Sequence, residues 1–329
     1  MPKVSVVVPV YNTAPYLDAC IQSLLQQTLC DLQIICVDDG STDGSGEMLD
    51  AYASRDSRVH VIHQENRGQS AARNAGIREA EGEYVYFLDS DDFLEADALE
   101  RLRKEMAARR LDLLLFSPVA FADTEAMEAK LESYKTLYHR NGTYPDVYTG
   151  RELLEMQIKN KDYAPGPWGY MIRSAFLREN GIRFYEGIYH EDELFTPQCL
   201  LLAERAACIP DALYHRRLRE GSVMTKAKSF RHAYGIFTAA DELMRFLHAH
   251  QLEDCAGVMA RTERQITRAY KLFRDLPAEE MGKLLDLPPE EQTRFRLGML
   301  MARDGELLKQ IRELKKRVAQ LEAGAAGNT

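Results

Sequence analysis

The stretch Tyr84-Val85-Tyr86-Phe87-Leu88-Asp89-Ser90-Asp91-Asp92 joins a run of apolar and aromatic residues to three carboxylates. Such an apolar run is typical of a buried strand, and open α/β sheets bind their ligands at the carboxyl ends of their strands. Asp89 and Asp91 are two residues apart, so in an extended chain they point to the same side and can approach one hard cation. We therefore predict a divalent metal at Asp89 and Asp91 that binds a diphosphate. The alternative is that these residues only turn the chain and cap a helix beginning near Glu95 or Asp97.

The pattern around this stretch predicts an α/β fold. Short apolar runs alternate with helical patterns through the first 116 residues, which favours a mostly parallel sheet with helices on both faces. The expected strands are 3–8, 33–38, 59–63, 84–88 and 112–116, and the expected helices are 14–27, 44–54, 69–79 and 96–109.

The second half of the sequence is less regular. Beyond 116 we expect one further strand at 168–172, a helix at 191–202, and two short strands at 206–209 and 212–217. From Phe230 on, the apolar spacing predicts almost continuous helix. We therefore expect an α/β domain of residues 1–225 and a C-terminal helical region of residues 226–329.

The last helical segment, 306–322, carries a short heptad pattern. Its apolar residues follow one another at spacings of four, three, four and three: Leu307, Ile311, Leu314, Val318 and Leu321. Two interpretations are open, a helix docked on its own domain or a short coiled coil that forms a homodimer.

Composition excludes several classes of protein. The 329 residues carry a net charge of -9, which argues against nucleic-acid binding. The six cysteines have no zinc-ligand spacing, so we expect free thiols in a reducing cytosol. No apolar stretch reaches the ~20 residues of a spanning helix, and the chain opens into a strand without signal-peptide architecture. We expect a cytoplasmic protein without a transmembrane segment, and peripheral contact with the inner face of a membrane is left open.

Three further loops carry polar or glycine residues where expected strands end. Pro9-Val10-Tyr11-Asn12 is not a glycine-rich phosphate loop, which disfavours NAD and ATP cradles, and Tyr11 either stacks on a nucleobase or packs against the next helix. Asp39, after the second strand, can accept a hydrogen bond from a pyrimidine N–H. Gly68 lets the backbone approach a ligand, and Arg73 can reach a phosphate or a base edge.

Together these motifs resemble a known family. Val-Ser-Val-Val-Val-Pro-Val-Tyr-Asn, Val-Asp-Asp-Gly-Ser-Thr-Asp, Gly-Gln-Ser-Ala-Ala-Arg-Asn and Leu-Asp-Ser-Asp-Asp occur in the order and spacing of glycosyltransferase family 2. The resemblance is close over 3–116 and thinner over 165–225. It implies the GT-A fold, a nucleotide-diphospho-sugar donor, inversion at the anomeric carbon, and a DXD metal site for Mn²⁺ or Mg²⁺ at Asp89 and Asp91. The donor site that it implies comprises Pro9, Tyr11, Asn12, Asp39, Gly68, Ser90 and Arg73.

The family also has a catalytic base about a hundred residues beyond the metal motif. Its Glu-Asp pair matches Glu191 and Asp192, so the resemblance makes Asp192 the expected base for the acceptor hydroxyl. From the residues alone, an acidic first helical turn favoured by the helix dipole is the preferred explanation of the pair.

Two nearby features have open interpretations. The cationic segment from His215 to His232 has three possible roles: it closes over the diphosphate, it meets a phosphate-bearing lipid acceptor, or it is a solvated loop. His215 either joins the metal ligands or is structural. Trp168 and Tyr170 either form a platform for a sugar or belong to the core.

The function expected from the resemblance is the transfer of one sugar from a UDP-sugar to a hydroxyl of a glycan or lipid-linked acceptor, in cell-envelope or capsular polysaccharide synthesis. Processive synthases of the family have membrane helices and a Gln-x-x-Arg-Trp motif, and this sequence has neither. Two alternatives are a nucleotidyltransferase, which would carry a glycine-rich basic loop after the first strand, and a non-catalytic scaffold.

Overall fold

An eight-stranded sheet forms the centre of the protein. The computed structural model describes residues 2–138, 140–220 and 227–326, with side chains of the last helix described up to Leu307. The strands are β1 Val4–Val10, β2 Leu32–Asp38, β3 Val59–His63, β4 Tyr84–Phe87, β5 Phe93–Leu94, β6 Leu113–Ala122, β7 Tyr170–Arg173 and β8 Ala206–Leu218. Their order in the sheet is β3-β2-β1-β4-β7-β6-β8-β5.

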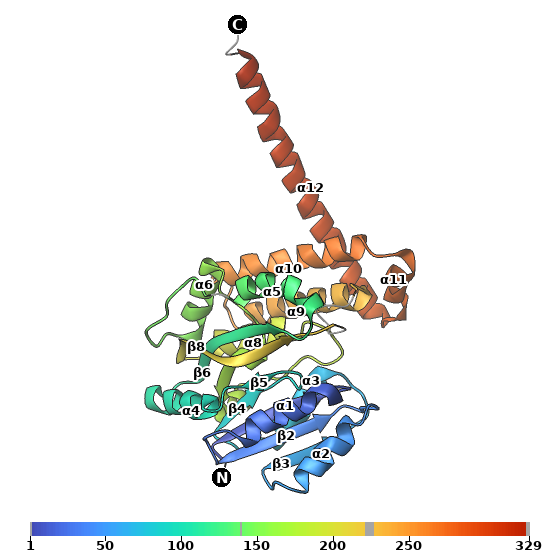
Figure 1. Ribbon diagram of the computed structural model, residues 1–329. Coiled ribbons are helices and arrows are strands. Elements are labelled where there is room, and N and C mark those ends of the chain that lie inside the picture. The colour runs from blue at the N-terminus through green and yellow to red at the C-terminus, as the bar shows by residue number, and fades with distance from the viewer. Residues whose placement is uncertain (1, 139, 221–226, 327–329) are drawn as a thin grey trace.

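The helices lie on both faces of the sheet and form a separate layer at the C-terminal end (Figure 1). They are α1 Ala14–Leu25, α2 Ser45–Ala53, α3 Gln69–Glu79, α4 Ala98–Arg109, α5 Glu125–Tyr138, α6 Gly150–Asn160, α7 Ser174–Glu179, α8 Asp192–Leu202, α9 Phe230–Ala249, α10 Ala256–Arg274, α11 Ala278–Gly282 and α12 Pro289–Ala326, with short 3₁₀ turns at Pro167–Gly169 and Lys283–Asp286.

The first half of the sheet is parallel, as the sequence predicts. β1 pairs in parallel with β2 and β4, and β2 pairs in parallel with β3. Every residue of β1, β2 and β4 is buried, because helices cover both faces. The carboxyl ends of these strands therefore meet at one edge, where Tyr11, Asp39 and Asp89 follow them.

The second half of the sheet is mixed. β7 lies antiparallel between β4 and β6, and β6 pairs in parallel with β8. The two short strands expected over 206–217 are one strand, β8, with a register irregularity between Cys208 and Ala212 where the gap was expected. The expected strand at 168–172 starts two residues later, because Trp168 lies in the 3₁₀ turn.

The segment 117–190 contains helices that the sequence analysis did not identify. α6 begins with a capping box, in which the Thr149 hydroxyl accepts a hydrogen bond from the Glu152 N–H and the Glu152 carboxylate accepts one from the Thr149 N–H. Leu153, Leu154 and Gln157 form its buried face. This pattern was readable in the sequence, whereas prolines and aromatics around it obscured the periodicity.

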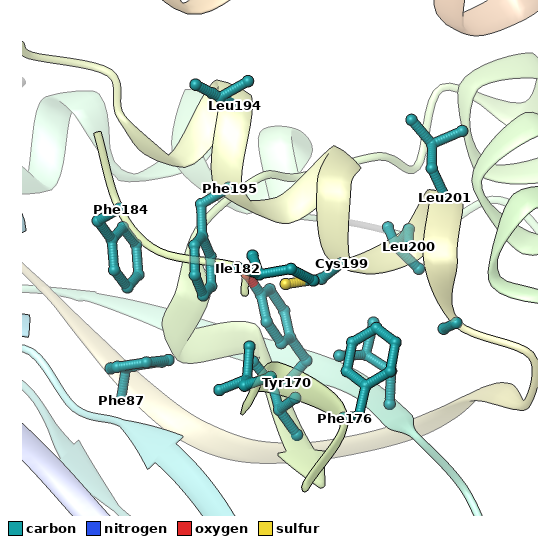
Figure 2. Close-up of a cluster of buried hydrophobic side chains, with 14 of the residues drawn as sticks. Phe87, Tyr170, Phe176, Ile182, Phe184, Leu194, Phe195, Cys199, Leu200 and Leu201 are labelled. Atoms are coloured by element: carbon teal, nitrogen blue, oxygen red, sulfur yellow. The ribbon is translucent and has the colours of Figure 1, made fainter. Parts of the chain in front are cut away.

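An aromatic cluster fixes α8 against the sheet (Figure 2). Phe195 of α8 stacks on Phe184 with ring centroids 3.7 Å apart, and both rings contact the edge or face of Phe87 in β4 at 5.9 and 5.2 Å. Tyr170 joins the cluster through a 2.6 Å hydrogen bond between its hydroxyl and Thr196 Oγ1. Because Phe87 precedes Asp89 by two residues and Phe195 follows Asp192 by three, this packing sets the distance between the acidic loop and α8.

The C-terminal helices pack closely on the α/β part. Gly235 of α9 lies so near the backbone of Tyr189 that a Cβ there would be 2.1 Å from the Tyr189 carbonyl oxygen. Within the helical region, Gly298 of α12 packs against the ring of Phe237 of α9. Residues 1–225 and 226–329 thus share interfaces; whether each folds as a domain stays a prediction.

Helix α12 projects far from the rest of the molecule (Figure 1). Over its first part, Phe295, Met299 and Ala302 are buried against the body, whereas Leu297, Leu300, Met301 and Leu307 on the other side are exposed. Apart from Leu307, the side chains of the heptad segment lie outside the described residues. None of the helices in the described part of the chain combines the length and the apolar character that a membrane span requires.

Candidate active site

The acidic loop after β4 presents a cluster of oxygen ligands. Asp89, Asp91 and Asp92 each offer a carboxylate oxygen, and these three oxygens lie within 4.8 Å of one another. Oxygen-only ligand sets suit Mg²⁺ and Mn²⁺, so the residues fit the expected metal. Asp89 and Asp91 are partly exposed, whereas Asp92 is 3% exposed.

Asp92 was missed by the sequence analysis as a member of this cluster. Its Oδ1 accepts a 2.6 Å hydrogen bond from the Arg217 N–H, and its Oδ2 accepts one from the Tyr214 hydroxyl. Burial and the neighbouring Asp91 raise the pKa of Asp92 well above its ordinary value. Both oxygens are engaged with β8, so Asp92 ties the acidic loop to β8, and Asp89 and Asp91 remain the better metal ligands.

Three arginines from the end of β8 lie over the acidic loop. β5 follows the loop directly and pairs antiparallel with β8, with Phe93 opposite His215, so the residues after His215 run back past the aspartates. Arg219 Nε donates a 2.6 Å hydrogen bond to Asp91 Oδ2, and Arg217 Nε donates one to the Asp91 carbonyl oxygen. Arg216 lies 4.0 Å from Asp89 Oδ2. This part of the cationic segment is therefore part of the site and not a solvated loop, whereas Lys226 lies outside the described residues.

Arg73 connects the acidic loop to α8. It is 2% exposed, and its two terminal nitrogens form ion pairs with Asp89 Oδ1 at 2.8 Å and Glu191 Oε1 at 2.6 Å. The guanidinium also lies over the Phe184 ring. These partners differ from the nucleoside expected for Arg73. In this arrangement it holds the metal motif and the Glu191-Asp192 pair together across the site.

The surroundings of Asp192 raise the pKa of its carboxyl group. Burial raises the pKa of Asp192 to about 8, with further upward contributions from Glu191 and Glu193 that Arg73 partly offsets. Glu193 is held by α10, through Arg261 at 2.6 Å and Gln265 at 2.7 Å. A partly buried carboxylate of raised pKa can accept a proton from a hydroxyl near neutral pH, and the expected role of Asp192 as base stays a prediction.

The residues at the end of β1 and in the loop after it differ in exposure: Tyr11 is exposed, whereas Pro9 is buried and Asn12 is hydrogen-bonded to a neighbouring loop. Tyr11 is 50% exposed, as a stacking surface for a base requires, whereas Pro9 is buried inside β1. Asn12 has a left-handed backbone (φ 51°) and accepts a 2.8 Å hydrogen bond from the Thr42 N–H, which joins it to the loop after β2. The Ser90 hydroxyl lies 3.0 Å from that of Thr13.

The carboxylate of Asp39 positions the loop before α3. Its Oδ1 accepts hydrogen bonds from Gln64 Nε2 at 2.6 Å and the Arg67 N–H at 2.9 Å, and its Oδ2 accepts one from the Gly68 N–H at 2.8 Å. A carboxylate offers about four acceptor positions, so a single position on Oδ2 is left for the expected base contact. Gly68 needs its positive φ of 87° to bring that N–H toward Asp39.

The contacts of three further residues favour structural roles. His215 Nε2 lies 2.6 Å from Glu95 Oε1 and its ring stacks on Phe93, so its described partners lie outside the aspartate cluster. Trp168 and Tyr170 are 5% and 1% exposed and belong to the core, with Trp168 stacked on Tyr214.

Comparison with known proteins gives consistent matches. Residues 5–176 match the family described as Glycosyl transferase family 2. The chain is 35% identical over 237 residues to "Glycosyltransferase GlyG" of Streptococcus pneumoniae, covering 67% of this chain and 72% of that protein. It is 30% identical over 262 residues to "Poly(ribitol-phosphate) beta-glucosyltransferase" of Bacillus spizizenii, covering 78% of this chain and 38% of that protein.

Among solved structures, residues 1–349 of TarS from S. aureus in complex with UDP-GlcNAc superpose with a TM-score of 0.63 at 26% identity, covering 91% of this chain and 81% of that one. The sheet and its helices are therefore those of a GT-A glycosyltransferase. Curated relatives differ in length, and the chain covers 31% of one pneumococcal relative and 72% of another. On its motifs, its fold and these matches, the chain belongs to glycosyl transferase family 2.

Proposed function

We propose that this protein is an inverting, metal-dependent glycosyltransferase that moves a single sugar from a UDP-sugar to a hydroxyl of a glycan or lipid-linked acceptor. One observation carries the proposal: the Arg73 ion pairs join Asp89 of the acidic loop to Glu191, next to Asp192. The Arg73 guanidinium thus holds Asp89, an expected metal ligand, and Glu191, the residue next to the expected base.

Each side chain has a distinct task in the proposed displacement. Asp192 accepts the proton of the acceptor hydroxyl as that oxygen attacks the anomeric carbon. Arg216 and Arg219, already beside the acidic loop, bind the diphosphate and stabilise the negative charge that grows on it. Asp89 and Asp91 would hold the metal, which when bound supplies a Lewis acid for the departing diphosphate. Tyr11 stacks on the base.

The donor and the acceptor are proposed on different grounds. The UDP-sugar is supported by the TarS complex with UDP-GlcNAc and by the exposed Tyr11. A role in cell-envelope or capsular polysaccharide synthesis is supported by the Bacillus relative, which is named as a poly(ribitol-phosphate) glucosyltransferase. The cytoplasmic location expected from the sequence stays a prediction.

A donor-binding experiment tests this function. We expect UDP-sugars with Mn²⁺ to raise the apparent melting temperature, since a ligand of the native state stabilises by mass action, and we expect slow metal-dependent release of UDP. GDP- and dTDP-sugars serve as controls for the base. Release of pyrophosphate from a nucleoside triphosphate and a sugar phosphate would identify the nucleotidyltransferase instead. Binding without any release of UDP, with or without acceptor, would favour the scaffold.

The oligomeric state is a second part of the proposal, in which α12 forms a parallel two-stranded coiled coil with a second copy of this chain. The exposed Leu297, Leu300 and Leu307 are in heptad register with the sequence beyond, but Asp304 occupies the core position between Leu300 and Leu307, so the uninterrupted apolar seam begins at Leu307. Ile311 and Val318 occupy the positions where β-branched residues favour dimers, and Leu at the alternate positions agrees with this. Arg317 and Glu322 have the spacing of an interchain ion pair.

Leu314→Glu in the full chain is expected to convert the dimer into a monomer in sedimentation velocity, because a charge would be buried in the seam. Ala319→Glu, on the outer side of the same helix, is the matched control and should remain dimeric. A monomeric wild type at high protein concentration would contradict the proposal.

A further inference from the structure

A second concave site lies between the C-terminal helices and the loop that leads into α8. This cleft of about 820 Å³ is lined by His190, by Lys228 before α9, by His232 of α9, and by α10 and α12. On α10, Arg264, Arg268 and Lys271 recur at spacings of four and three, so they share one helix face. Lys228 and the basic face of α10 therefore converge on one cleft, beside His190 and His232, in a protein whose net charge is negative.

The positive charge in this cleft is not balanced by its own carboxylates. Of the acidic lining residues, Glu306 pairs with Lys271 at 3.1 Å and Asp275 pairs with Arg274 at 2.7 Å. Glu263 is the remaining acid of the lining. Within the described part of the chain, Lys228, Arg264 and Arg268 have no ion pair, so three cations face one carboxylate.

The electrostatic consequences are visible at two of these groups. The pKa of His190 is lowered to about 4, mainly by burial and further by the positive charges of Arg268, His232 and Lys228. Its Nε2 is buried without a hydrogen-bond partner among the described residues. Burial and Arg268 also lower the pKa of Lys228. Cations held this close to one another are stabilised by an anion placed between them.

The cleft and the expected base, Asp192, are built on the same segments of the chain. His190 precedes Asp192 by two residues and has a left-handed backbone with a φ of 65°. Arg261 and Gln265 of α10 hold Glu193, the residue after Asp192, and they come from the same helix as Arg264 and Arg268. An anion seated in the cleft would thus be anchored to the framework that carries Asp192.

We propose that this cleft binds a phosphate group of the acceptor, so that the acceptor class is a phosphate-bearing polyol or lipid and its hydroxyl is presented to Asp192. The inference rests on the proposed function for the identity of the reaction, but not for the binding of phosphate itself. Guanidinium and ammonium groups bind phosphate oxygens through charge-assisted hydrogen bonds, and the cleft is large enough for a phosphate with part of its carrier.

Binding of soluble phosphates to the full chain tests the proposal. We expect sn-glycerol 3-phosphate to bind saturably to the wild type in isothermal titration calorimetry. The double variant Lys228→Gln/Arg268→Gln should bind it about ten- to a hundredfold more weakly, because each substitution removes a charge-assisted hydrogen bond to the phosphate. Arg296→Gln removes an exposed cation from α12 outside the cleft and should bind as the wild type does. Metal-dependent UDP release should be the same in all three proteins.

A second arm distinguishes the two sources of phosphate. Vesicles of phosphatidylcholine with and without phosphatidylglycerol report a lipid phosphate, and glycerol 3-phosphate reports a soluble one. Cleft-dependent binding in either arm supports the proposal and names the source. Wild-type protein that binds neither, or a double variant that binds as tightly as the wild type, overturns it. If none of the three proteins releases UDP but the wild type still binds phosphate through the cleft, the proposed function is contradicted and this inference is not.

Discussion

Asp192→Asn is expected to slow sugar transfer severely while donor binding is retained. The substitution keeps the shape of the side chain but removes the proton acceptor, and general-base catalysis contributes about 10²- to 10⁴-fold. The rate of transfer should fall by this factor, while the melting-temperature increase caused by UDP-sugar and Mn²⁺ stays the same. Asp97→Asn, at an exposed carboxylate that starts α4, is the matched control and should have wild-type rates.

The pH profile gives this prediction a direction. The base acts only when it is unprotonated, and burial raises the pKa of Asp192 to about 8, so kcat/KM should rise with pH through the neutral range. Below that pKa, the rate should fall about tenfold for each pH unit. A flat profile between about pH 5 and 8, where ordinary carboxylates are already ionised, would contradict the assignment. So would an Asn variant with more than about a tenth of wild-type activity.

Asp91→Asn is expected to remove metal binding and metal-dependent activity together. Asp91 has one oxygen engaged by Arg219 and is partly exposed, so the protein should fold. Loss of a ligand carboxylate lowers the affinity for a divalent cation. Without the bound metal, the reaction loses the several kcal/mol by which a metal stabilises the charge that develops in the transition state. Mn²⁺ should no longer raise the melting temperature with UDP, and UDP release should fall by at least about a hundredfold.

Asp92→Asn is the discriminating control for the metal site. An asparagine can still accept a hydrogen bond from the Arg217 N–H and donate one to the Tyr214 hydroxyl, so the tie between the loop and β8 is kept. We expect this variant to retain Mn²⁺ binding. Asp89→Asn is less informative, because it leaves Arg73 with one of its two carboxylate partners in a buried place and should also lower stability. Full Mn²⁺ binding by Asp91→Asn would refute the assignment of the metal ligands.

The residues of the site that could be predicted lie in short motifs directly after predicted strands. Asp89 and Asp91 follow an apolar strand, and the loops of Tyr11 and Asp39 follow two others, so parallel pairing brings them to one edge without further information. The contacts within that edge were less predictable. Asp39 holds the backbone of Arg67 and Gly68, which the expected role as a base acceptor did not anticipate.

By itself, the sequence determined the parallel first half of the sheet, the acidic loop at its edge and the family, because each depends on residues close together along the chain. Tertiary structure alone decided that Arg73 joins Asp89 to Glu191, which lies 118 positions after Arg73, and that the end of β8 places arginines beside the aspartates. The physical reason is that local patterns set which strands and helices form, whereas strand register and the packing of Phe87, Phe184 and Phe195 set which charges meet.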